Sequence, residues 1–315
     1  MRRVALLAAA AALLAACSST VKGHPDQGEN TDQPSGRRAI PQTAIGDPAT
    51  ADLCAEITAE AALVVGSLIV DPHQAAGQCV AALKGSGDVQ LSLELTAERP
   101  DAADPAATPG PTVAGLATKK LPESGGFCGR EVWSSGVVVL VQVQNLGAEA
   151  GQGSVCAVAD AVTSRVAADV AGGRVHRRPV ASPSITSIDV CQGMRPDDLP
   201  GATTVGRPVF GLTCVLVAGD ITLGARPAFR HNGERPVATL TVGQHRLARY
   251  DATSSDEGFC GITSDQGNAA QNTREVLDIW MARGPNAPAS APKGRALCDL
   301  AVQEAGRILT RLGLS

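Results

Sequence analysis

The sequence predicts two tandem domains of one design, each containing both helices and strands. The motif Gly-Phe-Cys-Gly occurs twice, at residues 126–129 and 258–261. Four cysteines surround each copy, at intervals of 25, 49 and 28 residues in the first set and 23, 46 and 38 in the second. Self-similarity on this scale indicates a repeated structural unit. The two sets are Cys54, Cys79, Cys128 and Cys156, and Cys191, Cys214, Cys260 and Cys298.

In the first repeat the apolar pattern changes from helical to extended and back. The Ala-rich run 55–63 predicts a helix that ends near Gly66. Residues 89–96 alternate apolar and polar side chains, which predicts a half-buried strand. The apolar run 137–143 predicts a second strand. Valines spaced four residues apart after Cys156 predict a final helix.

The second repeat follows the same order with two irregularities. Pro196 and Pro200 predict a short or irregular first helix. Residues 214–217 and 235–242 predict strands, and one apolar face after Cys298 predicts the last helix. Residues 273–283 fit a helix as well as a strand at 276–281. We favour the strand because the repeat requires one there.

The N-terminus predicts a lipoprotein signal peptide at residues 1–16. A basic start precedes an apolar run at 4–13, which is too short for an ordinary membrane-spanning helix. Leu14-Ala15-Ala16-Cys17 then resembles the lipobox of bacterial lipoproteins. The resemblance implies cleavage before Cys17 and lipidation of its thiol, which anchors the chain at the outer, extracytoplasmic face of the cytoplasmic membrane. The alternative is a plain signal peptide that leaves Cys17 an ordinary thiol.

The cysteine count agrees with lipidation and export. Nine cysteines become eight when Cys17 is set aside, and these divide evenly between the repeats. Disulfides persist in exported proteins, whereas zinc sites usually contain closely spaced cysteines, and here no two lie within 22 residues of each other. We expect pairing within each repeat, first with second and third with fourth, although four cysteines allow three connectivities.

The composition of the sequence divides residues 17–315 into a tether, two domains and a linker. Residues 17–50 lack apolar periodicity and predict a flexible tether, followed by domain 1 at 51–173, a linker at 174–187 and domain 2 at 188–315. Residues 52–171 carry 6 basic and 14 acidic side chains, and residues 188–315 carry 13 of each. No region is basic enough to indicate nucleic-acid binding. Aromatic residues are scarce, which argues against a carbohydrate-binding module, and Trp133 and Trp280 are expected in the cores.

The order of these elements resembles a known family. Cysteine, helix, cysteine, strands, Gly-x-Cys, strand, cysteine and helix follow one another as in a four-cysteine domain of unknown function found in many actinobacterial lipoproteins. The resemblance covers almost all of residues 50–315, in two copies. It implies an α+β fold, an antiparallel sheet flanked by helices, with no established activity. The chain departs from the family pattern at Val80 and Val215, where a tryptophan follows the second cysteine.

Motifs for catalysis, metals and cofactors are missing from the sequence. We find no nucleophile elbow, zinc-protease helix, phosphate loop or dinucleotide fingerprint. The sequence therefore predicts no cofactor, no metal and no enzymatic activity. One stretch of the second repeat is rich in cations, and facing strands could bring several of them onto one face that holds an anion. The plainer alternatives are a solvated face or a surface that docks on the acidic first repeat. The candidate residues are Arg226, Arg230, His231, Arg235, His245, Arg246 and Arg249.

These observations favour a lipid-anchored, non-catalytic envelope protein that binds a partner protein or a small anionic or lipid ligand. Two alternatives remain open from the sequence. One is an envelope hydrolase with a site between the domains, and the other is a structural spacer in envelope complexes.

Overall fold

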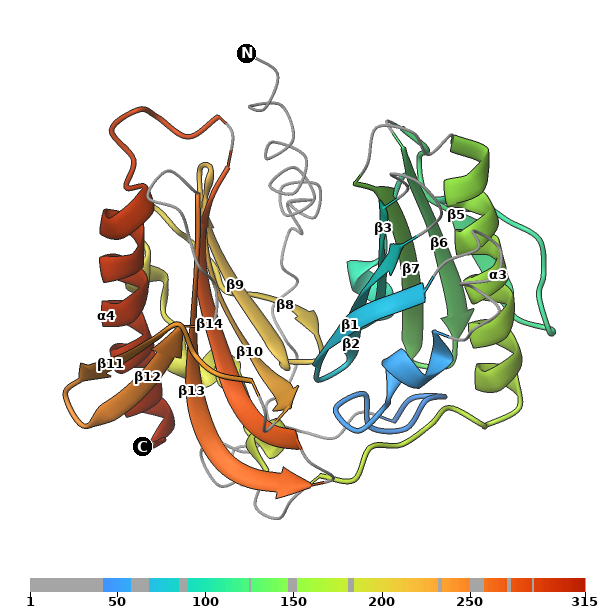
Figure 1. Cartoon of the computed structure of the whole chain (residues 1–315). Helices are drawn as coiled ribbons and strands as arrows, with labels where there is room; N and C mark the ends of the chain where they lie inside the picture. The colour runs from blue at the N-terminus through green and yellow to red at the C-terminus, as the bar shows by residue number, and fades with distance from the viewer. Residues whose placement is uncertain are drawn as a thin grey trace. The chain divides into compact units, whose positions relative to one another are not determined.

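The chain folds into two compact units, residues 40–180 and 181–315 (Figure 1). The structure is a computed structural model, and it describes residues 42–57, 68–84, 90–124, 126–146, 152–180, 184–231, 234–249, 258–270, 273–284 and 286–314. Each unit is an antiparallel sheet with a long α-helix against one face and two disulfides. The predicted α+β fold is therefore confirmed. The signal peptide and Cys17 lie outside the described residues.

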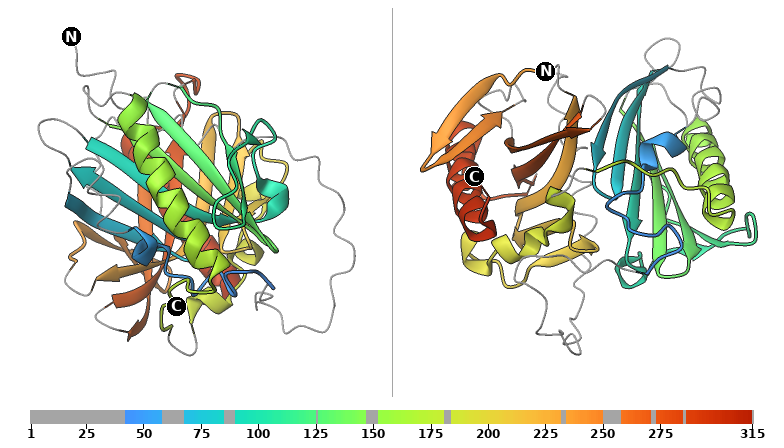
Figure 2. Two further views of the ribbon diagram at one scale, coloured as in Figure 1. Left: turned by 90° about the vertical axis from the view of Figure 1, so that its right-hand side faces the viewer. Right: turned by 90° about the horizontal axis from the view of Figure 1, so that it is seen from below.

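The sheet of the N-terminal unit has the strand order β1-β2-β3-β7-β6-β5-β4, and every neighbouring pair is antiparallel. Helix α3 (Gln152–Ala171) packs along β6 and β7 (Figure 2). The strands are β1 (Leu68–Ala75), β2 (Gln78–Lys84), β3 (Gln90–Glu98), β4 (Thr108–Pro109), β5 (Ala117–Lys120), β6 (Phe127–Ser134) and β7 (Val137–Asn145).

The alternation of apolar and polar side chains along β3 explains which residues of this strand enter the core of the unit. Leu91, Leu93 and Leu95 are fully buried and lie on the face that α3 covers. From α3, Val158, Val162 and Val166 are buried in the same layer, since four-residue spacing places them on one side of the helix. The predicted strand at 89–96 is thus confirmed from Gln90 onward, as are the strand at 137–143 and the helix after Cys156.

The C-terminal unit has the strand order β8-β9-β10-β14-β13-β12-β11, again with antiparallel pairs. Helix α4 (Gly294–Leu312) packs mainly on β13 and β14. Leu216, Leu223, Ile262, Leu277 and Ile308 form part of its buried core. The strands are β8 (Gly206–Val209), β9 (Thr213–Ala218), β10 (Ile221–His231), β11 (Ala238–Val242), β12 (His245–Arg249), β13 (Phe259–Ala270) and β14 (Thr273–Arg283).

The two units have the same topology. Numbered within its own unit, each sheet runs first, second, third, seventh, sixth, fifth, fourth strand, and the helix follows the seventh strand. Each Gly-Phe-Cys-Gly motif lies at the start of the sixth strand, β6 or β13. The repeat that the cysteine spacing predicts is therefore present in the strand order.

The cysteines pair as predicted, first with second and third with fourth in each unit. The bridges are Cys54–Cys79, Cys128–Cys156, Cys191–Cys214 and Cys260–Cys298, with Cα–Cα distances of 5.1 to 5.3 Å. In each unit one bridge ties a 3-10 turn to the second strand, and the other ties the sixth strand to the helix. The 3-10 turns are η1 (Leu53–Glu56) and η4 (Val190–Gly193).

The predicted tether ends earlier than residue 50. The Ala44 N–H donates to Ser135 O at 2.8 Å, and Ile45 is fully buried. The predicted linker also begins too early, because Asp52 N–H donates to His176 O at 2.9 Å and Arg178 N–H to Thr50 O at 2.8 Å. Residues 42–50 and 174–178 therefore belong to the N-terminal unit. Local composition missed them because the hydrogen bonds that attach them to the unit join segments far apart in the sequence, such as Arg178 N–H to Thr50 O.

Two further expectations on secondary structure are resolved. Residues 273–283 form β14, so the helical alternative is wrong and the favoured strand is confirmed. The helix predicted at 55–63 is wrong at its start, where Leu53–Glu56 form a 3-10 turn capped by the Asp52 side chain. The rest of that prediction, from residue 58, lies outside the described residues.

Candidate functional site

The predicted basic patch is divided between two strands that are not neighbours. Arg226, Arg230 and His231 lie on β10, whereas His245, Arg246 and Arg249 lie on β12. Strands β13 and β14 separate β10 from β12 in the sheet. Arg235 is exposed in the segment before β11.

The residues of the patch also point to different faces of the sheet. His245 is buried on the α4 side, where its Nε2 lies 2.9 Å from Thr310 Oγ1 of the helix. Arg249 is on the same side by strand alternation, whereas Arg246 is exposed on the opposite side. Arg226 and Arg230 also lie opposite α4, since they alternate with Leu223 and Ala225 of the core. Only three of the seven, Arg226, Arg230 and Arg246, are thus placed on one face among the described residues.

Arg230 belongs to a charge network that the sequence did not reveal. Its guanidinium lies 3.2 Å from Asp278 of β14 and 3.3 Å from Glu234. Asp278 also accepts a hydrogen bond from Thr263 Oγ1 of β13 at 2.8 Å. Burial acts to lower the pKa of Arg230, but the two carboxylates outweigh burial and raise it. Arg230 is consequently a fixed cation whose charge is balanced within the sheet.

Beside this network, Trp280 and Arg226 form a stacked pair over a glycine. The indole ring lies across Gly224, where an added Cβ would come 2.1 Å from a ring atom. The guanidinium carbon of Arg226 lies 5.2 Å from the centre of the ring, a cation–π distance. Trp280 is half-buried on the face opposite α4 and not in the core, which corrects the sequence expectation. We call Gly224, Arg226 and Trp280 the Trp280 platform.

The corresponding face of the N-terminal unit is acidic. Trp133 of β6 is half-buried there, donating from Nε1 to Glu131 at 2.8 Å, with Lys119 Nζ 3.7 Å from its ring centre. The expectation that Trp133 is a core residue is likewise wrong. Burial and the nearby charges of Glu131 and Glu94 raise the pKa of Glu98 to about 8. Tryptophans thus lie opposite the helix in both units, where Trp133 contacts Glu131 and Lys119 and Trp280 contacts Arg226.

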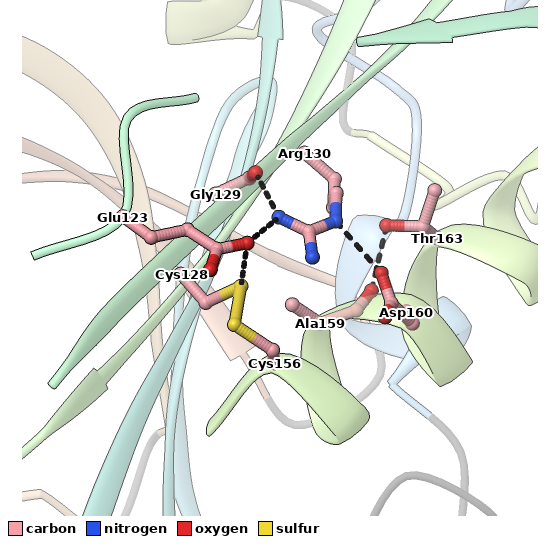
Figure 3. The surroundings of a disulfide bond; sticks show 8 residues. All are labelled: Glu123, Cys128, Gly129, Arg130, Cys156, Ala159, Asp160 and Thr163. Carbon is pink, nitrogen blue, oxygen red and sulfur yellow. Dashed lines mark hydrogen bonds and ion pairs between the residues drawn. A yellow bond between two sulfur atoms is a disulfide. The ribbon is translucent and has the colours of Figure 1, made fainter. Parts of the chain in front are cut away.

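Arg130 organises the surroundings of the Cys128–Cys156 disulfide (Figure 3). Its buried guanidinium donates to Asp160 of α3 at 2.7 Å and to Gly129 O at 2.9 Å, and lies 3.2 Å from Glu123. Glu123 also approaches Cys128 Sγ at 3.8 Å. Because both sulfurs are disulfide-bonded, they are not thiolate ligands, and the same holds for Cys191 and Cys214 beside Asp189. These clusters brace the disulfides and do not form metal sites.

A buried pair of carboxyl groups lies at the other end of α3. Glu56 of η1 and Asp169 of α3 are each 1% exposed, and burial raises the pKa of Glu56, a rise that His176 opposes and Asp169 increases. Glu56 Oε1 lies 3.1 Å from His176 Nδ1, and Arg174 Nε lies 3.1 Å from Asp169 Oδ1. Paired carboxyls beside a histidine are a common arrangement for acid–base chemistry. Here neither carboxyl is accessible to a substrate, so the pair is not an active site in this structure.

No protein-family model matches the chain, and no curated protein is similar to it in sequence. Among solved structures, the chain shows a likeness to the di-domain ARO/CYC StfQ from the steffimycin biosynthetic pathway. That likeness has 10% sequence identity, covers 84% of this chain and 94% of that chain, and has a TM-score of 0.17. We draw neither fold nor function from a TM-score of this size. Within the described ranges, no helix has the length and apolar character needed to cross a membrane.

Proposed function

We propose that the protein is a lipid-anchored, extracytoplasmic lipoprotein that binds an anionic ligand or an acidic partner without catalysis. The four disulfides support an oxidising compartment, since such bonds persist in exported proteins. The sequence around Cys17 supports the anchor, and two or more acyl chains there hold a protein stably at a membrane.

The observation that carries the binding role is the Trp280 platform. A guanidinium that stacks by its face on an aromatic ring keeps its N–H groups in a fixed plane. Such a plane suits the two oxygens of a carboxylate or phosphate. The neighbouring Arg230–Asp278–Thr263 network fixes the strands on which the platform is built. Rigid backing of this kind lowers the entropy lost when a ligand binds.

Binding is favoured over catalysis by the state of the acid–base groups. Within the described part of the chain, the clearest carboxyl pair, Glu56 and Asp169, is buried and occupied by arginine and histidine contacts. The platform itself consists of a guanidinium, an indole and a glycine, and the first two recognise charged and planar groups but are poor general bases. We therefore place the function in recognition.

Native and denaturing mass spectrometry of the protein extracted from membranes tests this proposal. We expect extra mass in the native spectrum alone, lost in the Arg226→Ala variant. Arg295→Ala is the matched control, because that arginine is 94% exposed on α4, and the platform lies on the face of the sheet opposite α4. Retention of the mass in Arg226→Ala, or its equal loss in both variants, would contradict the platform as the binding site. A bare native mass, together with no response of Trp280 fluorescence to phosphate or carboxylates at constant ionic strength, would contradict anion binding.

A further inference from the structure

The face of the C-terminal sheet opposite α4 consists of rows of side chains that cross the strands. Partners in the register of an antiparallel pair lie directly beside each other on one face, so the register defines each row. One row, which we call the apolar row, crosses β9, β10, β14 and β13 and consists of Val217, Thr222, Ala282 and Phe259. These residues alternate along their strands with core residues such as Leu223 and Met281, which places the row opposite α4.

Two side chains of the apolar row are large and open to water. Phe259 is 39% exposed and Val217 is 44% exposed. Their strands are three positions apart in the sheet, which separates them by about 14 Å, and the small side chains of Thr222 and Ala282 lie between them. Isolated exposed apolar residues are ordinary, but a group of them on one face beside the half-buried indole of Trp280 marks a place where another molecule binds.

The polarity of this face changes along the strands. Trp280 and Gly224 pair in the row next to the apolar row, and Arg226 and Asp278 pair in the row after that. Successive rows are about 6.7 Å apart, because they are two residues apart along each strand. The guanidinium of Arg226 lies over Trp280, 5.2 Å from the ring centre, so the cation is held at the border between the charged and the apolar parts of the face.

The charges at the two ends of this surface favour one orientation for an anion. Asp220, in the turn between β9 and β10, lies beyond the apolar row and would repel an anion there. Asp278 lies beside Arg226, but its carboxylate is engaged by Arg230 at 3.2 Å. An anionic group is therefore favoured at Arg226. A hydrocarbon attached to that group meets apolar side chains when it extends across Trp280 to the apolar row.

Building on the anion-binding role proposed above, on which this inference rests, we propose that the ligand of the Trp280 platform is an anionic amphiphile. Its carboxylate or phosphate binds Arg226, and its hydrocarbon part lies across Trp280 on the apolar row. A hydrophilic anion such as inorganic phosphate leaves Phe259 and Val217 in water. A hydrocarbon part covers them, and the removal of apolar surface from water is the main favourable contribution to such binding.

Titration of the full protein in lipid nanodiscs with butyrate and with octanoate tests the class of ligand. In the Trp133→Phe variant Trp280 is the remaining tryptophan of the chain, so its fluorescence reports occupancy of the platform. A fully buried methylene group tightens binding by a factor of about 4, so the longer octanoate should bind at least ~10-fold more tightly than butyrate. Empty nanodiscs correct for the partitioning of octanoate into lipid.

The double variant Val217→Thr and Phe259→Ala tests the place of the hydrocarbon part. It should reduce the affinity ratio of octanoate to butyrate to below ~3-fold and leave butyrate binding unchanged. Leu300→Ala is the matched control and should keep the full ratio, because Leu300 is 37% exposed on α4, which packs on the other face of the sheet. Octyl phosphate and methyl phosphate form the second pair. A gain from the longer chain in either pair supports the proposal, and the tighter head group identifies the source of the anion.

Octanoate and octyl phosphate that bind no more tightly than their short counterparts would overturn the amphiphile and leave anion binding at the platform intact. Octanol that binds as tightly as octanoate would also overturn it, because the anion would then contribute nothing. An equal loss of the chain-length ratio in Leu300→Ala and in the double variant would remove the apolar row from the site. If none of these anions changes the fluorescence of Trp280, anion binding at the platform is contradicted as well.

Discussion

The indole of Trp280 on β14 lies directly over Gly224 on β10, its partner in the strand register. Residue 224 tolerates no side chain, because a Cβ there would come 2.1 Å from the ring. The ring covers the backbone of β10 and in turn supports Arg226. A glycine in the middle of a strand, which weakens the strand on its own, is thus explained by the close approach of an aromatic side chain.

Gly224→Ala is therefore expected to destabilise the C-terminal unit by about 1–3 kcal/mol through steric conflict with the ring. Displacing Trp280 should also change its fluorescence emission. Urea unfolding followed by fluorescence measures both effects. Thr222→Ala, on the same face of the same strand, is the control and should cost less. An unchanged midpoint for Gly224→Ala would contradict the contact.

The Arg230–Asp278 pair is expected to contribute more than a surface ion pair. Their side chains are only 16% and 17% exposed, so Arg230→Ala leaves the Asp278 carboxylate partly buried without its main cation. We expect a loss of roughly 1–3 kcal/mol, with a coupling energy in the double-mutant cycle with Asp278→Ala. The Arg295–Asp299 pair of α4, 94% and 65% exposed, is the control and should show coupling of at most ~0.5 kcal/mol. Equal coupling in the two cycles would argue against the network.

Glu98 is expected to make the N-terminal unit less stable at alkaline pH. Its pKa is raised to about 8 by burial, Glu131 and Glu94, so the folded state holds this proton more tightly than the unfolded state. Stability is then lost as pH rises from the usual value of 4.5 toward 8. Glu98→Gln should stabilise the protein at pH 9 by on the order of 1–3 kcal/mol, a range kept modest because the side chain is partly solvated. At pH 4 the substitution should change stability little, because Glu98 then carries its proton in the folded state and largely in the unfolded state. Denaturant unfolding at the two pH values measures this difference. Asp101→Asn, at an exposed carboxylate, should show no such pH dependence.

Cys17 is expected to carry the membrane anchor. The Cys17→Ser variant, which provides no thioether, should move the protein from the detergent phase to the aqueous phase in a temperature-induced detergent separation. The mass of the N-terminal peptide should change accordingly. Detergent partitioning of Cys17→Ser identical to that of the wild type would contradict lipidation at this residue.

The architecture was largely predictable because the spacing of the cysteines and the short-range periodicity of apolar residues both indicate it. The cysteine intervals anticipate the tandem repeat and the pairing Cys54–Cys79, and alternation locates β3 from Gln90 onward. Strand β10 escaped prediction because Pro227, two arginines and a histidine interrupt its apolar pattern, and its pairing with β14 overrides that local signal. The 3-10 turn at Leu53–Glu56 escaped for a similar reason, since its Ala-rich flank has high helix propensity.

The candidate site was less predictable because it depends on which strands become neighbours. Sequence reasoning grouped Arg226 with Arg246 by their proximity in the chain, although two strands separate them in the sheet. It also missed Asp278, which lies 48 residues from Arg230 in the chain. Nothing in the sequence indicates that the third strand pairs with the seventh. Had the register been known, it would have placed Asp278 opposite Arg226 and Trp280 opposite Gly224.

The shared strand order sets the sequence in which each unit can close. The third strand pairs with the seventh in each unit. Strand β3 therefore cannot pair with β7, nor β10 with β14, until the strands between them in the sequence have been synthesised. The first disulfide of each unit joins nearby segments and can form early, whereas Cys128–Cys156 and Cys260–Cys298 need the helix that follows the seventh strand. Such non-local pairing makes folding slow. During synthesis from the N-terminus, the first unit can be complete while the second still has an incomplete sheet.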